Sequence, residues 1–353
     1  MKESVDISII CACRNEASHI RAFVDSILEQ DFGRLSWEVL IADGMSDDGT
    51  REILDQYTAK NPHIQVLANP GRIVSTGLNA AIAASRGPII LRFDAHTSYS
   101  PDYCLRCVEI LERTGAVNVG GPARTRAFGA KARAIAAAYH SRFSTGGARF
   151  HDPDFEGSVD TVPYGCWRRE TFDRVGLFDE TLVRNQDDEF NLRIIRSGGA
   201  IWQSPAIVSW YSPRPTLRGL FHQYFQYGFW KVAVVRKHRV PGSWRHVAPA
   251  GFVLAHILLL LTMAVSAESG ATRGLIWTGA LWLTITGLYA VAVLIASLAA
   301  ARKVGWVTLP YLPGAFVAFH VSYGLGFLTA LLRFAMQRSE KPSSNSVFAR
   351  ITR

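Results

Sequence analysis

The sequence lacks the glycine-rich fingerprint that dinucleotide-binding proteins carry after their first strand. An apolar run at Ile7–Cys13 is predicted to be that strand, but Arg14-Asn15-Glu16 follows it where a G-x-G-x-x-G motif would stand. Backbone amides therefore have no close approach to a pyrophosphate, which argues against an NAD-dependent enzyme. A nucleotide bound at this place has to be held by side chains.

Cysteine is scarce, and a secretory signal is missing as well. Cys104 and Cys107 form a C-x-x-C pair among five cysteines, but no second pair or histidine stands at zinc spacing. We interpret them as small buried residues, and the five cysteines fit a reducing compartment. Glu3 and Asp6 precede an apolar run too short for a signal peptide, so we expect residues 1–246 to stay in the cytoplasm.

Charge is absent from three long stretches in the last third of the chain. Each is longer than the roughly 20 residues that a helix needs to cross a hydrocarbon core. The stretches are Val247–Ala267, Leu275–Ala301 and Val304–Leu332. One such stretch could be a buried core helix, but three in series predict a transmembrane region over 247–334 with two or three hydrophobic segments. Three full crossings would put the basic tail at 335–353 outside, against the positive-inside tendency; alternatively the third stretch, which contains Pro310 and Pro313, re-enters and returns.

Acidic residues are missing from 205–246, where seven Lys and Arg stand among many aromatic residues. This composition predicts amphipathic helices at the bilayer surface, and it favours anionic lipid headgroups or phosphate as partners over nucleic acid. A solvated charged face is the alternative. The net charge of +9 arises in the membrane-proximal part, because residues 1–204 carry 23 basic and 27 acidic side chains.

Short apolar runs alternate with helical segments from Ile7 to about residue 120. This order predicts an α/β fold with a doubly wound, mainly parallel sheet and helices on both faces. Such sheets bind ligands beyond the carboxyl ends of their strands. We expect 1–204 to be the catalytic domain, with a helix over Phe128–Arg142 and a further strand over Asp160–Gly165.

Two loops that follow predicted strands carry acidic residues. Asp43, Ser46 and Asp48 follow the second strand; a carboxylate there can bind a base or ribose, although a plain capping turn would use the same residues. Asp94 and His96 follow the fourth strand, and residues two apart in an extended segment point the same way. Their oxygen and nitrogen suit Mn²⁺, or Mg²⁺ completed by diphosphate and water, whereas a surface histidine is the alternative.

A third acidic cluster begins the helix predicted over Asn185–Ser197. Asp187, Asp188 and Glu189 there could simply interact with the helix dipole, or one of them could act as a general base on an acceptor hydroxyl. Sugar transfer from a nucleotide diphosphate needs one such carboxylate, because the diphosphate leaves without protonation once its charge is neutralised. The paired acids of glycoside hydrolases are therefore not expected.

Together these residues resemble the motifs of the family 2 glycosyltransferases, which have the GT-A fold. The similarity is greatest to the branch of succinoglycan-biosynthesis proteins like ExoA, and it covers about residues 4–231 and, more loosely, the membrane tail. The matching motifs, in chain order, are Asn15-Glu16 for N-E, residues 43–50 for D-x-x-S-x-D-G-T, and Asp94-Ala95-His96 for D-x-D. His96 stands where the family has a second aspartate.

The resemblance implies roles for individual residues. The residues that it implies bind the nucleotide sugar are Asn15, Glu16, Asp43, Ser46, Asp48 and Asp94. Asp94 and His96 would hold a divalent cation, Mg²⁺ or Mn²⁺. The family's E-D pair falls on Gln186-Asp187, which makes Asp187 the expected base. Those implied on the acceptor side are Gly165, Trp167, Asp188, Glu189, Gln226 and Trp230, the last two from an approximate Q-x-x-R-W element with Phe229 in place of Arg.

The resemblance also implies an activity and a location. We expect inverting transfer of a sugar, glucose from UDP-glucose, to a polyprenyl-diphosphate-linked saccharide in exopolysaccharide biosynthesis. The expected protein is a multi-pass inner-membrane enzyme with a cytoplasmic catalytic domain, working beside other exopolysaccharide assembly proteins. Two alternatives stay open: a polyprenyl-phosphate glycosyltransferase, and a non-catalytic membrane assembly subunit that kept the fold, which the changes at Gln186 and Phe229 would favour.

Overall fold

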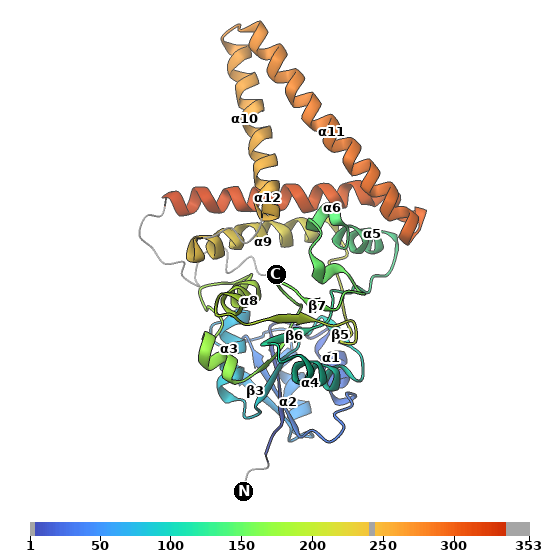
Figure 1. Ribbon diagram of the computed structural model, residues 1–353, viewed down its shortest axis with the longest axis vertical. Helices are drawn as coiled ribbons and strands as arrows, with labels where there is room; N and C mark the ends of the chain where they lie inside the picture. Colours follow the sequence, from blue (N-terminus) through green and yellow to red (C-terminus); the bar gives the residue numbers. More distant parts are fainter. Residues whose placement is uncertain (1–3, 240–243, 337–353) are drawn as a thin grey trace. The chain divides into compact units, whose positions relative to one another are not determined.

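A computed structural model describes residues 4–239 and 244–336, and the chain divides into two compact units (Figure 1). The first unit contains 4–125 and 149–212, and the second contains 126–148 and the described residues from 213 onward. The domain boundaries predicted at 204 and 246 stay predictions; the compact units instead divide at 212, and 126–148 group with the second unit. Most of the predicted basic tail lies outside the described residues.

An eight-stranded sheet forms the centre of the first unit, in the order β3-β2-β1-β4-β8-β6-β9-β7. Strands β3, β2, β1 and β4 are parallel to one another, while β8 is antiparallel to both of its neighbours. The strands are β1 (Ile7–Cys13), β2 (Trp37–Asp43), β3 (Ile64–Ala68), β4 (Ile89–Arg92), β6 (Asn118–Gly120), β7 (Gly157–Ser158), β8 (Cys166–Arg168) and β9 (Ile201–Gln203), with β5 (Thr97–Tyr99) and β10 (Ser209–Tyr211) in a separate antiparallel pair. The predicted mainly parallel α/β sheet is confirmed.

Helices cover both faces of this sheet because its central strands are apolar on both sides. Ile9 of β1 packs toward α1 and α4, whereas Ile10 packs toward α3 and α8. Gly77 of α3 allows close approach to the sheet, since a Cβ there would lie 2.8 Å from the Cβ of Ala12. The helices of this unit are α1 (Ile20–Leu28), α2 (Thr50–Thr58), α3 (Val74–Ala84), α4 (Tyr103–Thr114), α7 (Glu170–Val175), α8 (Gln186–Arg196) and the 3₁₀ turn η1 (Arg149–His151).

Two local expectations have different outcomes. Cys104 and Cys107 are buried in α4, as small core residues should be, and all five cysteines are free. The strand expected over Asp160–Gly165 is wrong: β8 begins only at Cys166. Tyr164 and Gly165 have φ angles of 62° and 108°, which lie outside the extended region that a strand requires.

The second unit contains helices and no strand among its described residues. Its elements are α5 (Ala130–Tyr139), α6 (Arg142–Thr145), α9 (Leu217–His238), η2 (Trp244–His246), α10 (Ala248–Glu268), α11 (Thr272–Val304), η3 (Trp306–Tyr311) and α12 (Leu312–Met336). Three of its segments are long and apolar enough to cross a membrane: α10, α11 and the stretch that joins η3 to α12. Figure 1 shows α10 and α11 as a hairpin, with α12 running across it beside α9.

Candidate active site

The loops after β1, β2 and β4 meet at one edge of the sheet. Cys13, the last residue of β1, lies opposite Asp43, the last residue of β2, and Ile10 lies opposite Arg92 at the end of β4. These three strands are parallel, so their carboxyl ends place the predicted acidic loops side by side. The expected location of the site therefore follows directly from strand register.

Hydrogen bonds tie the first two of these loops together. The backbone N–H of Asn15 donates to Ser46 Oγ at 2.9 Å, and its side-chain amide donates to Asp47 Oδ1 at 2.9 Å. The N–H of Glu16 donates to Thr50 Oγ1 at 2.7 Å. Asn15 adopts a left-handed conformation with φ of 55°, a region that asparagine tolerates better than most residues. The N-E dipeptide is thus held in a fixed turn against the following loop.

The acidic residues of the second loop are anchored by their own hydroxyl neighbours. Asp43 is 3% exposed, and its Oδ1 accepts a 2.5 Å hydrogen bond from Ser46. Asp48 accepts hydrogen bonds from the Thr50 hydroxyl at 2.5 Å and from the N–H of Ala17 at 3.1 Å. Slight burial raises the pKa of Asp48, but these bonds outweigh it, and the pKa is lowered from its usual range. Ser46 and Asp48 therefore brace the two loops, and Asp43 stands at the strand end.

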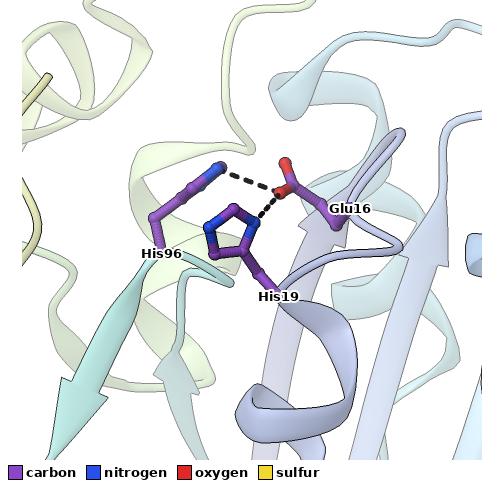
Figure 2. A group of neighbouring side chains, drawn as sticks. All are labelled: Glu16, His19 and His96. Atoms are coloured by element: carbon purple, nitrogen blue, oxygen red, sulfur yellow. Dashed lines mark ion pairs between the residues drawn. The ribbon is translucent and has the colours of Figure 1, made fainter. Parts of the chain in front are cut away.

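His96 lies near the carboxylates of Glu16 and Asp94, and Figure 2 shows its contact with Glu16. Its Nε2 is 2.9 Å from Glu16 Oε2, and its Nδ1 is 3.5 Å from Asp94 Oδ1. Hydrogen bonds with Asp94 and Glu16 raise the pKa of His96 to about 9. Burial raises the pKa of Asp94, but its bond and ion pair with His96 prevail and lower that pKa to about 2. Asp94 and His96, predicted as a pair, are therefore in direct contact.

The same group of side chains can hold a divalent cation once His96 has lost its proton, because only a neutral imidazole binds a metal. Glu16, His19 and His96 offer one carboxylate oxygen and two imidazole nitrogens that all lie within 4.8 Å of one another. Figure 2 shows the three side chains converging, with His19 at the start of α1. Mixed oxygen and nitrogen donors suit Mn²⁺ or another transition metal better than Mg²⁺, which prefers oxygen. The residues present fit the expected cation, with Glu16 and His19 beside the predicted Asp94 and His96.

Asp187 reaches this edge from the far half of the unit. It lies in the first turn of α8, and its Oδ2 is 3.5 Å from Nη1 of Arg92. The Arg92 side chain is 8% exposed, whereas that of Asp187 is 43% exposed, so the carboxylate remains open to solvent. Arg92 also lowers the pKa of Asp94 through its charge. One buried guanidinium at the end of β4, two residues before Asp94, thus contacts the helix that bears Asp187.

Comparison with known proteins identifies the family. A sequence profile of glycosyl transferase family 2 matches residues 8–174. The chain is 35% identical over 243 residues to the succinoglycan biosynthesis protein ExoA of Rhizobium meliloti (strain 1021), an alignment that covers 68% of this chain and 73% of ExoA. The chain belongs to glycosyl transferase family 2. The resemblance predicted from the sequence is confirmed, and the protein is a glycosyltransferase.

Two further similarities are to a named glycosyltransferase and to a solved structure of the same fold. It is 27% identical over 264 residues to a Methanococcus voltae protein named dolichyl N-acetyl-alpha-D-glucosaminyl phosphate 3-beta-D-2,3-diacetamido-2,3-dideoxy-beta-D-glucuronosyltransferase, covering 72% of this chain and 81% of that protein. It is structurally similar to the mannosyltransferase PcManGT of Pyrobaculum calidifontis, solved in complex with GDP-Man and Mn²⁺. The TM-score is 0.56 at 20% identity over 91% of this chain and 88% of that one, which shows the shared fold.

Several residues expected on the acceptor side of the glycosyltransferase lie in its interior. Trp167 is 1% exposed and packs in the core among the rings of Phe172, Phe178 and Phe190. Glu189 is 0% exposed, and both of its carboxylate oxygens accept hydrogen bonds from Arg193. Both side chains are buried, and their predicted contact with the acceptor stays a prediction.

The remaining acceptor-side residues lie in different places. Gly165 is buried, and its carbonyl accepts a hydrogen bond from the N–H of Arg92 at 3.0 Å, so its backbone adjoins the site. Asp188 is half-buried in the first turn of α8. Gln226 and Trp230 are buried in α9, in the second unit, and are 5% and 3% exposed. Their predicted contact with an acceptor stays a prediction.

His19 and Arg92 belong to the glycosyltransferase site but had no predicted role. His19 follows Glu16 at a spacing of three, but nothing in the sequence connects it to His96. Arg92 had a clearer signal, because a charged residue at the end of a strand buried on both faces needs a partner. That partner is Asp187, whose position relative to β4 depends on the sheet order.

Proposed function

We propose that this glycosyltransferase transfers glucose from UDP-glucose to a polyprenyl-diphosphate-linked saccharide, with inversion at the anomeric carbon. The observation that carries the proposal is that Arg92, at the carboxyl edge of the sheet, contacts Asp187 and acts through its charge on Asp94, which in turn contacts His96. A donor diphosphate and an acceptor hydroxyl need these two kinds of group close together. The name of ExoA as a succinoglycan biosynthesis protein supports a similar role here in exopolysaccharide assembly.

The donor half of the proposed site consists of strand-end side chains. Asp43 would accept hydrogen bonds from the uracil or ribose, with Asn15, Ser46 and Asp48 fixing the loops around it. Asp94 and His96, together with Glu16 and His19, would hold a divalent cation. When bound, such a cation neutralises the charge that develops on the departing diphosphate. The neighbour solved with GDP-Man and Mn²⁺ supports the choice of a nucleotide sugar and of manganese.

Asp187 is the proposed base. It lies in the first turn of α8, its Oδ2 is 3.5 Å from Nη1 of Arg92, and its side chain is 43% exposed, so an acceptor hydroxyl can reach it. The carboxylate would accept the proton of the acceptor hydroxyl while that oxygen bonds to the anomeric carbon. The bond from the anomeric carbon to the diphosphate oxygen breaks on the opposite face, and UDP leaves with its electron pair. Attack opposite to the leaving group inverts the configuration.

A lipid-linked acceptor and an inner-membrane location complete the proposal. The basic, aromatic stretch at 205–246 adjoins the apolar helices in sequence, and the Methanococcus voltae relative is named for a dolichyl phosphate-linked sugar. We infer a multi-pass protein with its catalytic domain in the cytoplasm, working with other exopolysaccharide assembly proteins.

Substitution of Asp187 tests the assignment of the base. In the purified full chain, Asp187→Asn should abolish UDP release from UDP-glucose with a lipid-linked saccharide acceptor, while UDP binding stays unchanged. Glu170→Gln is the matched control, because Glu170 is also an acid in a first helical turn but is exposed on α7. Turnover of Asp187→Asn near the wild-type rate would refute the role. Product formed on undecaprenyl phosphate alone would favour the polyprenyl-phosphate alternative.

A further inference from the structure

The three apolar segments of the second unit differ in how much protein covers them. In the most apolar window of α10, 17% of the residues are buried, and in that of α11, 11%. In the third segment, formed by η3 and α12, 50% are buried. A helix that faces lipid on most sides remains largely uncovered within its own chain, as α10 and α11 do. The segment containing α12 has a different surrounding.

The helix that covers α12 is α9, and the two run parallel in close contact. Leu217 contacts Gly314 near the start of both helices, Tyr224 meets Phe319 with ring centroids 4.3 Å apart, and Phe229 meets Phe334 near the other end. A Cβ on Gly228 would lie 2.1 Å from the Tyr323 carbonyl oxygen, and one on Gly326 would lie 2.0 Å from that of Phe225. Glycine at both positions allows the two backbones to touch, so α12 shares the depth of α9 along its whole length.

The composition of α9 keeps it out of the hydrocarbon core. It carries four Lys and Arg and no acidic residue, at Arg218, Lys231, Arg236 and Lys237. Arg218 lies near its start, Arg236 and Lys237 lie near its end, and Lys231 between them is buried; α9 is not among the candidate membrane spans of the described residues. A lysine inside a crossing helix is strongly disfavoured at the bilayer centre, and the terminal charges suit a surface with anionic headgroups. Because α12 follows α9 turn by turn, α12 cannot cross the bilayer without carrying these charges with it.

Lengths in α10 and α11 agree with this arrangement. Gly324 of α12 packs against Pro249 and Val253 in the first turns of α10, and the Tyr289 hydroxyl of α11 is 2.9 Å from His320 Nδ1 of α12. Beyond these crossings the hairpin retains residues 254–268 of α10 and 272–288 of α11, about 22 and 26 Å of helix. These lengths are somewhat shorter than a hydrocarbon core of about 30 Å, and α12 occupies the remaining thickness if it lies at the boundary of that core.

We propose that α12 lies in the plane of the bilayer surface and that α10 and α11 are the crossings formed by the described residues. Its outward face, with Val317, Leu331, Leu332 and Met336 exposed, rests on the acyl chains of the leaflet on the catalytic side. The chain then leaves α12 at Met336 on the same side as the first unit. Basic residues follow in the sequence at 338, 341, 350 and 353, and the positive-inside tendency favours this side of the membrane for such residues.

Depth measurement distinguishes an in-plane helix from a crossing one. Spin labels on Val317→Cys and Leu332→Cys of the full chain, in vesicles of phosphatidylethanolamine and phosphatidylglycerol, should report similar shallow depths by oxygen and nickel accessibility. A spanning α12 would separate these labels by about 22 Å along the membrane normal. Leu254→Cys and Val265→Cys on α10 are the matched control and should differ clearly in depth. The five native cysteines are buried, and the unsubstituted chain measures any background labelling.

Sidedness gives an independent second readout. In intact spheroplasts an impermeant maleimide should label Ser269→Cys, in the exposed turn between α10 and α11, but not Met336→Cys or Lys60→Cys. All three should react after permeabilisation. Labelling of Met336→Cys from outside, or depths of 317 and 332 that differ by about 20 Å, would overturn the proposal. Failure of Ser269→Cys to react from outside would likewise overturn it, because the hairpin would then not cross.

Discussion

Glu189 and Arg193 of α8 form a buried ion pair whose loss should measurably destabilise the fold. Nε of Arg193 lies 3.0 Å from both carboxylate oxygens of Glu189, and Nη2 lies 2.9 Å from one of them. Glu189 is fully buried, and the Arg193 side chain is 19% exposed. Breaking a buried pair typically costs about 3 to 5 kcal/mol because it leaves an uncompensated charge. Arg193 keeps bonds to the Val175 and Leu177 carbonyls, so Glu189→Gln should cost about 3 kcal/mol, the lower end.

Thermal unfolding of the full chain in detergent measures this effect. A loss of about 3 kcal/mol corresponds to a decrease of roughly 6 to 12 °C in Tm for a unit of this size. Asp55→Asn is the matched control, because it breaks the exposed Arg51–Asp55 pair, also spaced by four residues on a helix, and should change Tm by less than about 2 °C. If Glu189→Gln unfolds like the wild type but loses transferase activity, the carboxylate serves the acceptor and the structural role is wrong.

Three further changes test the cation site, an ion pair and the helix contact. His19→Ala should weaken Mn²⁺ binding at least roughly tenfold, as measured by electron paramagnetic resonance titration. His63→Ala is the control and should not weaken it, because His63 stacks on Trp37 and is not part of the cation site. If His19→Ala binds Mn²⁺ as tightly as the wild type, His19 is not a ligand. Burial raises the pKa of Glu38, but hydrogen bonds from Arg86 and Ser8 prevail and lower that pKa. The ionised Glu38 therefore stabilises the folded protein above the usual glutamate pKa, and this contribution is lost as pH falls through the lowered value. The difference in urea midpoint between wild type and Glu38→Gln should therefore narrow as pH falls from 7 toward 4, and a constant difference would contradict this. Gly326→Val should lower Tm and the yield of folded protein, because the valine side chain would collide with the Phe225 carbonyl. Gly287→Val on α11 is the control and should lower neither, because a Cβ there meets no atom within 4 Å. Similar Tm values for the two variants would disprove the contact between α9 and α12.

The sequence predicted the parts of the site that depend on strand boundaries. The apolar run Ile7–Cys13 coincides with β1. Asp43 ends β2 and Asp94 follows β4, and both strand ends show clearly in the sequence as a change from apolar to polar residues. Parallel register then brings those ends together without further information. This part of the site needed only local patterns and one rule about parallel sheets.

The parts that the sequence did not predict depend on contacts between distant segments. His19 approaches His96 only because the loop after β1 lies beside the loop after β4. Glu189 was grouped with its acidic neighbours, although Arg193 four residues later indicates an intrahelical ion pair. The Q-x-x-R-W comparison could not reveal that Gln226 and Trp230 are buried in α9. Neighbouring acids in a sequence can thus point to opposite sides of one helix.

Residues 126–148 leave the first unit after Thr125, form α5 and α6 in the second, and return at Arg149. Ala134, Ile135 and Ala138 of α5 share a buried cluster with Leu312 and Phe316 of α12. A truncation after residue 212 would remove α12 and expose the apolar face of α5 to solvent. A version of the enzyme intended for work without detergent should therefore also replace residues 126–148 with a short polar linker, because removal of the C-terminal helices alone is not enough.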